Sequence, residues 1–289
     1  MSIVNSKIKN MKKNKYSSFK WMLIATLFFS LMGLCVKLSS DLFTSHELVF
    51  YRSFLSLIII YPVMLKEEIS IKTNYIKLHL IRSIIGFISL IMFFYAITRL
   101  QLGTSMTLNY TSPLFLALFL PMLTKQKFNY QKVGFIVLGF IGVVLILKPI
   151  VNNNFPGLIG LLSGTGAAIA YIYVSKLGQL REPDLRTVFY FTLISSLLGI
   201  FFIDFDQMHK LFKFQNLALL IGLAIFATIA QLAITKAYRV GKALINGTYS
   251  YLTIVFSSVW GFLFLGELMD LLTIFGIALV IFAGLKVRA

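Results

Sequence analysis

The sequence predicts an all-α membrane protein with ten transmembrane helices, arranged as two inverted five-helix repeats. Of the 289 residues, 58% are hydrophobic and only 13% are charged, which is about half the charge that a soluble domain carries. The apolar residues recur in runs along the whole chain, and basic residues collect in every second gap between them. Short sequence matches between the two halves indicate the repeat.

The apolar runs define the predicted spans. A spanning helix needs roughly 20 mostly apolar residues, and the connections between the runs are too short for a soluble domain. The predicted spans are 19–38, 46–65, 77–97, 103–123, 130–147, 156–176, 186–204, 214–235, 243–265 and 270–286. Residues 1–20 then form a basic cytoplasmic tail, residues 21–150 the first repeat and residues 151–289 the second.

The distribution of basic residues predicts the orientation. Twenty Lys and Arg fall on the side that holds both termini and five fall on the other, while Arg52 and Arg82 lie within spans. Cytoplasmic loops are enriched in Lys and Arg. We therefore expect a multi-pass protein of the bacterial cytoplasmic membrane with both termini in the cytoplasm. The net charge of +17 follows from this topology, so the expected surroundings are a lipid bilayer and no nucleic acid.

Matches in order along the two halves predict a duplication. The sequence Ala-Ile-Thr followed by a basic residue ends the third span at Arg99 and the eighth at Lys236. Gly103 and Gly241 open the fourth and ninth spans, and two spaced glycines recur in the fifth and tenth, all at offsets of 137 to 142. An odd number of helices per copy inverts the second copy, an architecture that places a transporter's substrate site at the midplane between the halves.

A polar cluster in the fourth span is the first candidate site. Pro113 lacks a backbone donor and frees a carbonyl one turn earlier, near Asn109, and an unwound turn inside a membrane requires protein or a watery cavity beside it. The ninth span carries a similar polar cluster at the corresponding place. Substrate contact is the predicted role and interhelical hydrogen bonding the alternative. The candidates are Asn109, Tyr110, Asn246, Tyr249 and Tyr251.

Two arginines within spans are further candidates. A charge at the bilayer centre costs about 2.5–3.5 kcal/mol on insertion scales, so it normally faces protein or water. Arg52 and Arg82 could therefore contact an anion or carboxylate of a substrate, or could serve helix packing by snorkelling. Tyr95 and Gln231 complete the candidate set, with core packing as the alternative for each.

The residue types that are missing from the predicted spans exclude some classes of function. All ten acidic residues fall in connections or near span ends, which disfavours an exporter of cationic drugs driven by protons. We expect the cargo to be a neutral, zwitterionic or anionic metabolite. No paired intramembrane acids and no nucleophile motif occur, so an enzyme is not expected. No metal site or cofactor is expected either.

Ordered motifs extend the prediction to a family. The motif residues are Arg52, Arg82, Gly86, Phe94 to Ala96, Leu108 to Phe115, Leu265 to Glu267, Gly276 and Gly284. With ten spans, this pattern resembles the EamA-type transporters of the drug/metabolite transporter superfamily over residues 20 to 286. Two features depart from the family pattern: Thr124 and Lys125 replace a first-half Gly-Glu step, and the ninth span lacks a proline.

The resemblance implies a central cavity that opens alternately to each side of the membrane. It does not imply a particular substrate, since members of the family handle amino acids, other metabolites, methyl donors and drugs. We expect a small organic metabolite, such as an amino acid, and a monomer or weak homodimer. An importer of S-adenosylmethionine or a similar nucleotide-like metabolite, and a multidrug exporter, are the alternatives. The direction of transport is left open.

Overall fold

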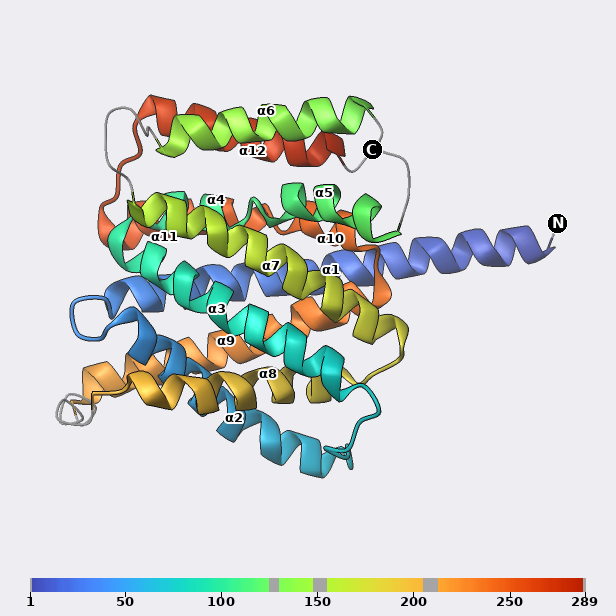
Figure 1. Ribbon diagram of the computed structural model, residues 1–289, viewed down its shortest axis with the longest axis horizontal. Helices are drawn as coiled ribbons and strands as arrows, with labels where there is room; N and C mark the ends of the chain where they lie inside the picture. Colours follow the sequence, from blue (N-terminus) through green and yellow to red (C-terminus); the bar gives the residue numbers. More distant parts are fainter. Residues whose placement is uncertain (1, 125–129, 148–154, 205–212, 288–289) are drawn as a thin grey trace.

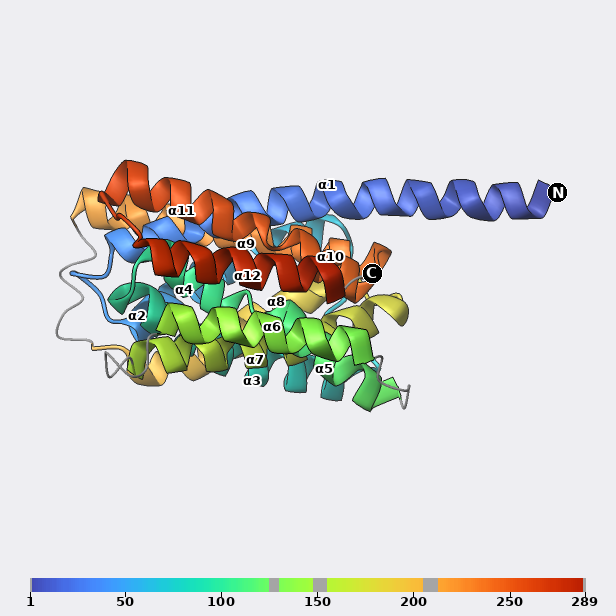
Figure 2. The ribbon, with the colours of Figure 1, turned by 90° about the horizontal axis from the view of Figure 1, so that it is seen from above.

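The computed structural model describes residues 2–124, 130–147, 155–204 and 213–287, and all regular secondary structure in these ranges is helical (Figures 1 and 2). The first half holds α1 (Ser2–Leu38), α2 (Ser45–Lys66), α3 (Ile76–Arg99), α4 (Leu102–Asn109), α5 (Ser112–Thr124) and α6 (Tyr130–Leu147). The second holds α7 (Phe155–Gln179), α8 (Asp184–Gly199), the 3₁₀ turn η1 (Ile200–Phe202), α9 (Phe214–Val240), α10 (Ala243–Tyr249), α11 (Leu252–Leu265) and α12 (Leu271–Val287).

The predicted class, an all-helical membrane protein, is confirmed. Each of the ten predicted spans coincides with one helix or with two consecutive helices. Seven of these segments are long and apolar enough to cross a membrane by themselves, and α6 and α12 contain shorter apolar stretches, Val133–Leu147 and Leu271–Lys286. The structure differs from a count of ten uninterrupted helices at the fourth and ninth spans. Each of these is two helices in series, α4 with α5 and α10 with α11.

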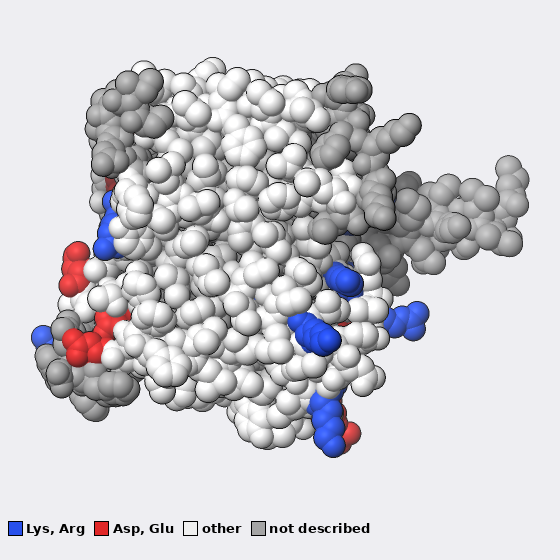
Figure 3. All heavy atoms as spheres, in the orientation of Figure 1, with Lys and Arg blue, Asp and Glu red and all other residues white. Residues whose placement is uncertain are grey.

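The helices run side by side between two ends of a bundle. Both termini lie at one end, here called the termini end, and α1 extends beyond the bundle there (Figure 1). The connections after α1, α3 and α11 lie at the other end, here called the far end. On the face in Figure 3 the visible Lys, Arg, Asp and Glu gather at these two ends and leave an uncharged band between them. Such a band suits the hydrocarbon layer of a membrane.

Helix pairings show the repeat in three dimensions. The most extensive contacts join α1 with α9, α3 with α7, α6 with α12 and α2 with α8. In the repeat, α1 corresponds to α7, α2 to α8, α3 to α9 and α6 to α12. The pair of α1 and α9 is therefore equivalent to the pair of α7 and α3. The other two pairs each join a helix to its own counterpart. Helices α1 and α7 also run in opposite directions (Figure 1). The structure therefore has two inverted copies packed around a shared centre.

The interruptions of the fourth and ninth spans occur at matching places. Tyr110 and Thr111 separate α4 from α5, and Ser250 and Tyr251 separate α10 from α11. In the first half the break precedes Pro113, whose missing N–H and bulky ring disfavour a continuous helix through this point. The second half breaks in the same place without a proline.

A network at the termini end joins the two halves. Glu182, in the connection from α7 to α8, accepts hydrogen bonds from Thr73 at 2.5 Å and from Arg186 at 3.1 and 3.2 Å. The Nε2 atom of His79 lies 3.0 Å from the same carboxylate. Burial alone would raise the pKa of Glu182, but these hydrogen bonds outweigh it and hold that pKa below its usual range.

A second tie joins the halves at the far end. The carboxylate of Glu267 accepts a hydrogen bond of 2.6 Å from the backbone N–H of Leu102, at the start of α4. Lys37 lies 3.8 Å from the same carboxylate and donates to the carbonyl of Leu100 at 2.7 Å. A carboxylate at a helix N-terminus satisfies an unpaired donor and interacts favourably with the helix dipole. The Gly-Glu step of the second half therefore fixes the start of α4 in the first.

Candidate central cavity

A small cavity lies inside the bundle between the two halves. Its volume is about 60 Å³, which is room for only a few water molecules. The lining comes from α1 to α4 and from α7 to α9, so both halves contribute. The lining residues are Phe29, Met32, Arg52, Arg82, Gly86, Ser89, Leu90, Phe93, Asn109, Tyr110, Ala167, Ala170, Tyr171, Phe191 and Gln231.

Arg52 enters this cavity from α2. It is the eighth residue of that helix, which places it about 10 Å from the far end at 1.5 Å per residue. Only 1% of the residue is exposed. Its Nη2 atom donates to Oε1 of Gln231 at 3.4 Å, while Nε and Nη1 have no hydrogen-bond partner.

Arg82 enters from α3 and approaches the cavity from the termini end. It is the seventh residue of its helix and is 3% exposed, and its Nε and Nη1 atoms also lack partners. The guanidinium carbon of Arg82 lies 3.8 Å from the ring centroid of Phe191, and that of Arg52 lies 5.1 Å from the same centroid. Phe191, on α8, therefore contacts both cations.

The ring contributes less than the burial costs. A cation–π contact stabilises by about 0.5–2 kcal/mol, whereas one charge near the bilayer centre costs about 2.5–3.5 kcal/mol. Neither arginine forms an ion pair with an acidic residue that the structure describes. The described residues that line the cavity also include no acidic side chain. The cavity is consequently a positive site whose charge the described chain leaves uncompensated.

The interruption between α4 and α5 shapes the opposite wall. Asn109 ends α4 and donates from Nδ2 to Oγ of Ser163 on α7 at 2.8 Å. Ser89 on α3 donates to the carbonyl of Ser163 at 2.8 Å. Helix α7 comes close here because Gly164 faces the carbonyls of Leu108 and Asn109. Asn109 and Tyr110 thereby reach the cavity while the free end of α4 stays attached to α7.

Five of the nine predicted site residues come together in this cavity. Arg52, Arg82, Asn109, Tyr110 and Gln231 all line it. Tyr171 lines it too, and its ring stacks on that of buried Tyr238 with centroids 4.9 Å apart.

The three candidates of the ninth span lie elsewhere. Asn246 donates to the carbonyl of Ala237 at 2.6 Å and accepts a hydrogen bond from Ser18, so its amide joins α10 to α9 and α1. The ring of Tyr249 packs edge-on against Phe19 with centroids 5.0 Å apart. Tyr251 is buried against Gly284 of α12.

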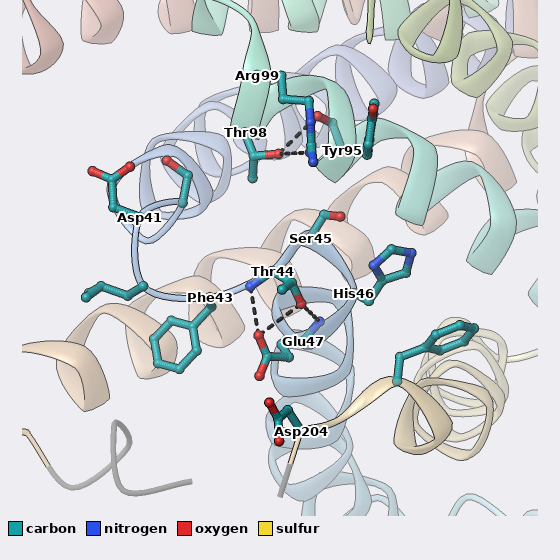
Figure 4. A pocket seen from close by; sticks show the side chains of 13 residues that line it. Asp41, Phe43, Thr44, Ser45, His46, Glu47, Tyr95, Thr98, Arg99 and Asp204 are labelled. Atoms are coloured by element: carbon teal, nitrogen blue, oxygen red, sulfur yellow. Dashed lines mark hydrogen bonds between the residues drawn. The ribbon is translucent and has the colours of Figure 1, made fainter. Parts of the chain in front are cut away.

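Tyr95 lies at the far end, in a hollow of about 640 Å³. In Figure 4, Tyr95, Thr98 and Arg99 lie on one side of this hollow, and Asp41 and the start of α2 on the other. The guanidinium carbon of Arg99 lies 3.8 Å from the centre of the Tyr95 ring. The hollow is open to the surroundings of the far end, and the central cavity lies deeper in the bundle.

Phe191 contacts both cavity arginines, and the sequence analysis did not select it. A phenylalanine within an apolar span has no polar signature, and the chain contains 28 of them. One signal was available: Phe191 follows Arg52 at an offset of 139, within the range of the repeat. Arg52 of the first half thus contacts Phe191, the residue at the corresponding position of the second half.

Comparison with known proteins agrees with this architecture. The model of the EamA-like transporter family matches the chain twice, over residues 17–148 and 155–286. A solved crystal structure aligns with a TM-score of 0.65 over 94% of this chain and 96% of that chain. Its 18% sequence identity supports the fold alone.

Curated relatives span nearly the whole chain. An uncharacterized transporter of Helicobacter pylori is 31% identical over 92% of this chain and 92% of its own length. The pseudopaline exporter of Pseudomonas aeruginosa is 28% identical over 90% and 92%. The S-adenosylmethionine uptake transporter of Rickettsia prowazekii is 23% identical over 92% and 90%. The chain is thus a multi-pass membrane transporter and not an enzyme, and it belongs to the EamA-like transporter family.

Proposed function

We propose that this protein moves a small organic metabolite with a carboxylate group across a bacterial cytoplasmic membrane by alternating access. The central cavity is the proposed substrate site. Arg52, Arg82, Asn109, Tyr110 and Gln231 are the proposed contacts within it. Both termini are placed in the cytoplasm on the basis of the twenty-to-five distribution of Lys and Arg.

One observation carries this proposal: two buried arginines share a cavity and have unused donors. Arg52 and Arg82 each bring two guanidinium nitrogens that are buried without a partner. A planar guanidinium matches a carboxylate through parallel hydrogen bonds. Buried donors without partners are costly, and a ligand that supplies acceptors relieves that cost.

The same geometry disfavours other cargo. A lipophilic cation would meet two like charges, and none of the cavity-lining residues is acidic. Proton-coupled export of cations usually depends on such an acid within the membrane. An amino acid or another zwitterion supplies a carboxylate to the arginines, and S-adenosylmethionine does so as well. Its sulfonium group, however, finds no acidic partner in the described lining.

Counterflow in proteoliposomes tests the proposal. Purified protein is reconstituted, vesicles are loaded with one unlabelled metabolite, and uptake of the same labelled metabolite is followed. We expect preloading with a suitable amino acid or organic acid to accelerate uptake. The amide or ester of that compound, which lacks the carboxylate, should not accelerate it. Accelerated exchange of quaternary ammonium compounds without exchange of any carboxylate would overturn the proposal.

Labelling of engineered cysteines tests the orientation. Cys35 is buried, so single cysteines at Lys72 near the termini end and at Asp41 near the far end provide a matched pair. In whole cells an impermeant maleimide should label the cysteine at position 41 and spare the one at position 72. The reverse pattern would place the termini outside.

A further inference from the structure

Resting on the proposed function, we infer that the cavity is built for an organic dianion, with one anionic group for each of Arg52 and Arg82. The inference concerns the substrate class of the same site. It starts from the number of charges and donors in the cavity and from where they lie.

The donors come in two separate sets. Arg52 enters from α2 and Arg82 from α3, and each keeps Nε and one terminal nitrogen unpaired. Gln231 accepts one bond from Arg52 but carries no charge. Four buried donor nitrogens, two on each cation, therefore lack acceptors, and each arginine can serve an anionic group of its own.

The charge count favours two anionic groups over one. Both guanidinium carbons lie within 5.1 Å of the same ring centre, close enough to repel each other strongly in a poorly hydrated site. A single carboxylate neutralises one of them and leaves the other buried and unpaired. Two carboxylates within one molecule neutralise both. The remaining polar side chains of the lining, Ser89, Asn109, Tyr110 and Tyr171, are uncharged and do not alter this count.

Phe191 holds the two cations in place. Its ring lies between α3 and α8, and a Cβ added to Gly86 would lie only 3.0 Å from Cε2 of that ring. The absence of a side chain at Gly86 thus lets the ring sit beside Arg82. We assign Phe191 as a positioning residue that contacts both guanidinium groups. The cavity of about 60 Å³ must widen to admit a whole dicarboxylate, as expected for one state of an alternating cycle.

Binding of matched acids and amides to the purified full chain tests the inference. The probes are the straight-chain dicarboxylates from malonate to adipate, and each is compared with its singly charged monoamide. Glycerol 3-phosphate is added as a dianion whose charge lies on one phosphate group. We expect at least one dianion to bind at least about 30-fold more tightly than its singly charged counterpart, because one arginine stays unpaired in the latter complex. Preference for the phosphate ester over every dicarboxylate would overturn the inference, because a single phosphate group does not supply one anionic group for each arginine.

Charge variants show whether the two arginines cause the preference. In Arg52→Gln and in Arg82→Gln the preference for dianion over monoanion should disappear. Lys286→Gln removes an exposed cation beside Phe282, at the termini end, and should leave the preference intact. Phe191→Leu should weaken the preference while both arginines remain. Melting of each variant without ligand establishes that it is folded.

The outcomes separate the inference from the proposed function. If monocarboxylates or zwitterions bind and exchange as well as every dianion, the inference fails and the proposed function stands. If no carboxylate or phosphate ester binds and none supports counterflow, both fail. A preference for the dianion that survives in both arginine variants would also overturn the inference.

Discussion

The fourth and ninth spans have the same interruption and use it differently. In the first half the break at Tyr110 and Thr111 turns Asn109 and Tyr110 toward the central cavity. In the second half the break at Ser250 and Tyr251 adds no residue to that cavity, and Asn246 ties α10 to its neighbours. The repeat therefore provides two equivalent interrupted spans, and among the described residues only the fourth span adds side chains to the proposed site.

The same asymmetry appears in the second and seventh spans. Arg52 in α2 corresponds by the repeat offset to Phe191 in α8, and the two side chains meet across the interface between halves. A cation in both places would add a third uncompensated charge to the cavity, and a ring in both would leave only the charge of Arg82. Divergence after duplication thus gives one half the charged groups and the other half the surface on which they rest.

Removal of a cavity arginine should have the largest effect. We expect Arg52→Met and Arg82→Met to abolish stabilisation by a bound carboxylate, a loss of more than about 100-fold in affinity. Each should also raise the free energy of unfolding of the empty protein by about 1–4 kcal/mol, because an unpaired buried charge is replaced by an apolar chain of similar length. Thermal melts with and without ligand measure both effects. A variant that lost stability and kept affinity would refute the account.

The two asparagines of the interrupted spans should differ in kind. Asn109→Ala and Asn246→Ala each remove a buried hydrogen bond, worth about 1–3 kcal/mol when a partner is left unsatisfied. Only Asn109→Ala should also weaken substrate binding, by about tenfold if the amide orients the ligand. Equal effects of the two substitutions on affinity would make the halves functionally equivalent, contrary to the structure.

The connections that follow α7 and α1 are counterparts, and the first is tied by Glu182 while the second borders the hollow in Figure 4. The pKa of Glu182 is lower in the folded protein than in the unfolded chain. Its stabilising contribution is therefore complete above the usual pKa of a glutamic acid and is lost as the pH falls through the folded value.

Glu182→Gln should reduce this dependence on pH. Denaturation midpoints measured from neutral to acidic pH should fall less steeply in the variant than in the parent protein. Glu47→Gln provides a matched control, since Glu47 forms the capping box of α2 with Thr44 within one half. If Glu182→Gln left the pH profile unchanged, the network would have no role in stability.

The smallest effect is expected at the second interruption. The hydroxyl of Tyr251 is buried without a hydrogen-bond partner among the described residues. Its removal in Tyr251→Phe should therefore cost no stability, raise the free energy of unfolding by about 1 kcal/mol at most, and leave transport unchanged. Melting and counterflow check this result. A large loss of transport in Tyr251→Phe would assign the ninth span to the site after all.

The sequence predicted the fold well because its strongest signals concern the fold. Helix number and arrangement follow from the apolar windows of spanning length, from the alternation of Lys-rich and Lys-poor connections, and from the ordered glycines. Only the interruption of the ninth span had no sequence feature that indicated it. Pro113 marked the first interruption. Span nine has no proline, so its break became visible only in three dimensions.

The site was predicted in part for a physical reason. Arg52, Arg82 and Gln231 stand out because burying a charged or polar side chain within a membrane costs free energy. Such residues inside apolar spans can therefore be recognised in a single sequence. Which way a side chain points depends on helix rotation and on neighbours. For that reason Asn246 and Tyr249 resembled Asn109 and Tyr110 in sequence and yet lie in packing contacts. Phe191 carried no polar signal at all.

The most direct test of the central claim is counterflow of a labelled carboxylate through the protein and through the Arg52→Met/Arg82→Met double variant. The account predicts accelerated exchange by the parent protein and none by the double variant, which should nevertheless melt at a higher temperature. Exchange of the same carboxylate at the parental rate by the folded double variant would show that the cavity arginines do not bind the cargo.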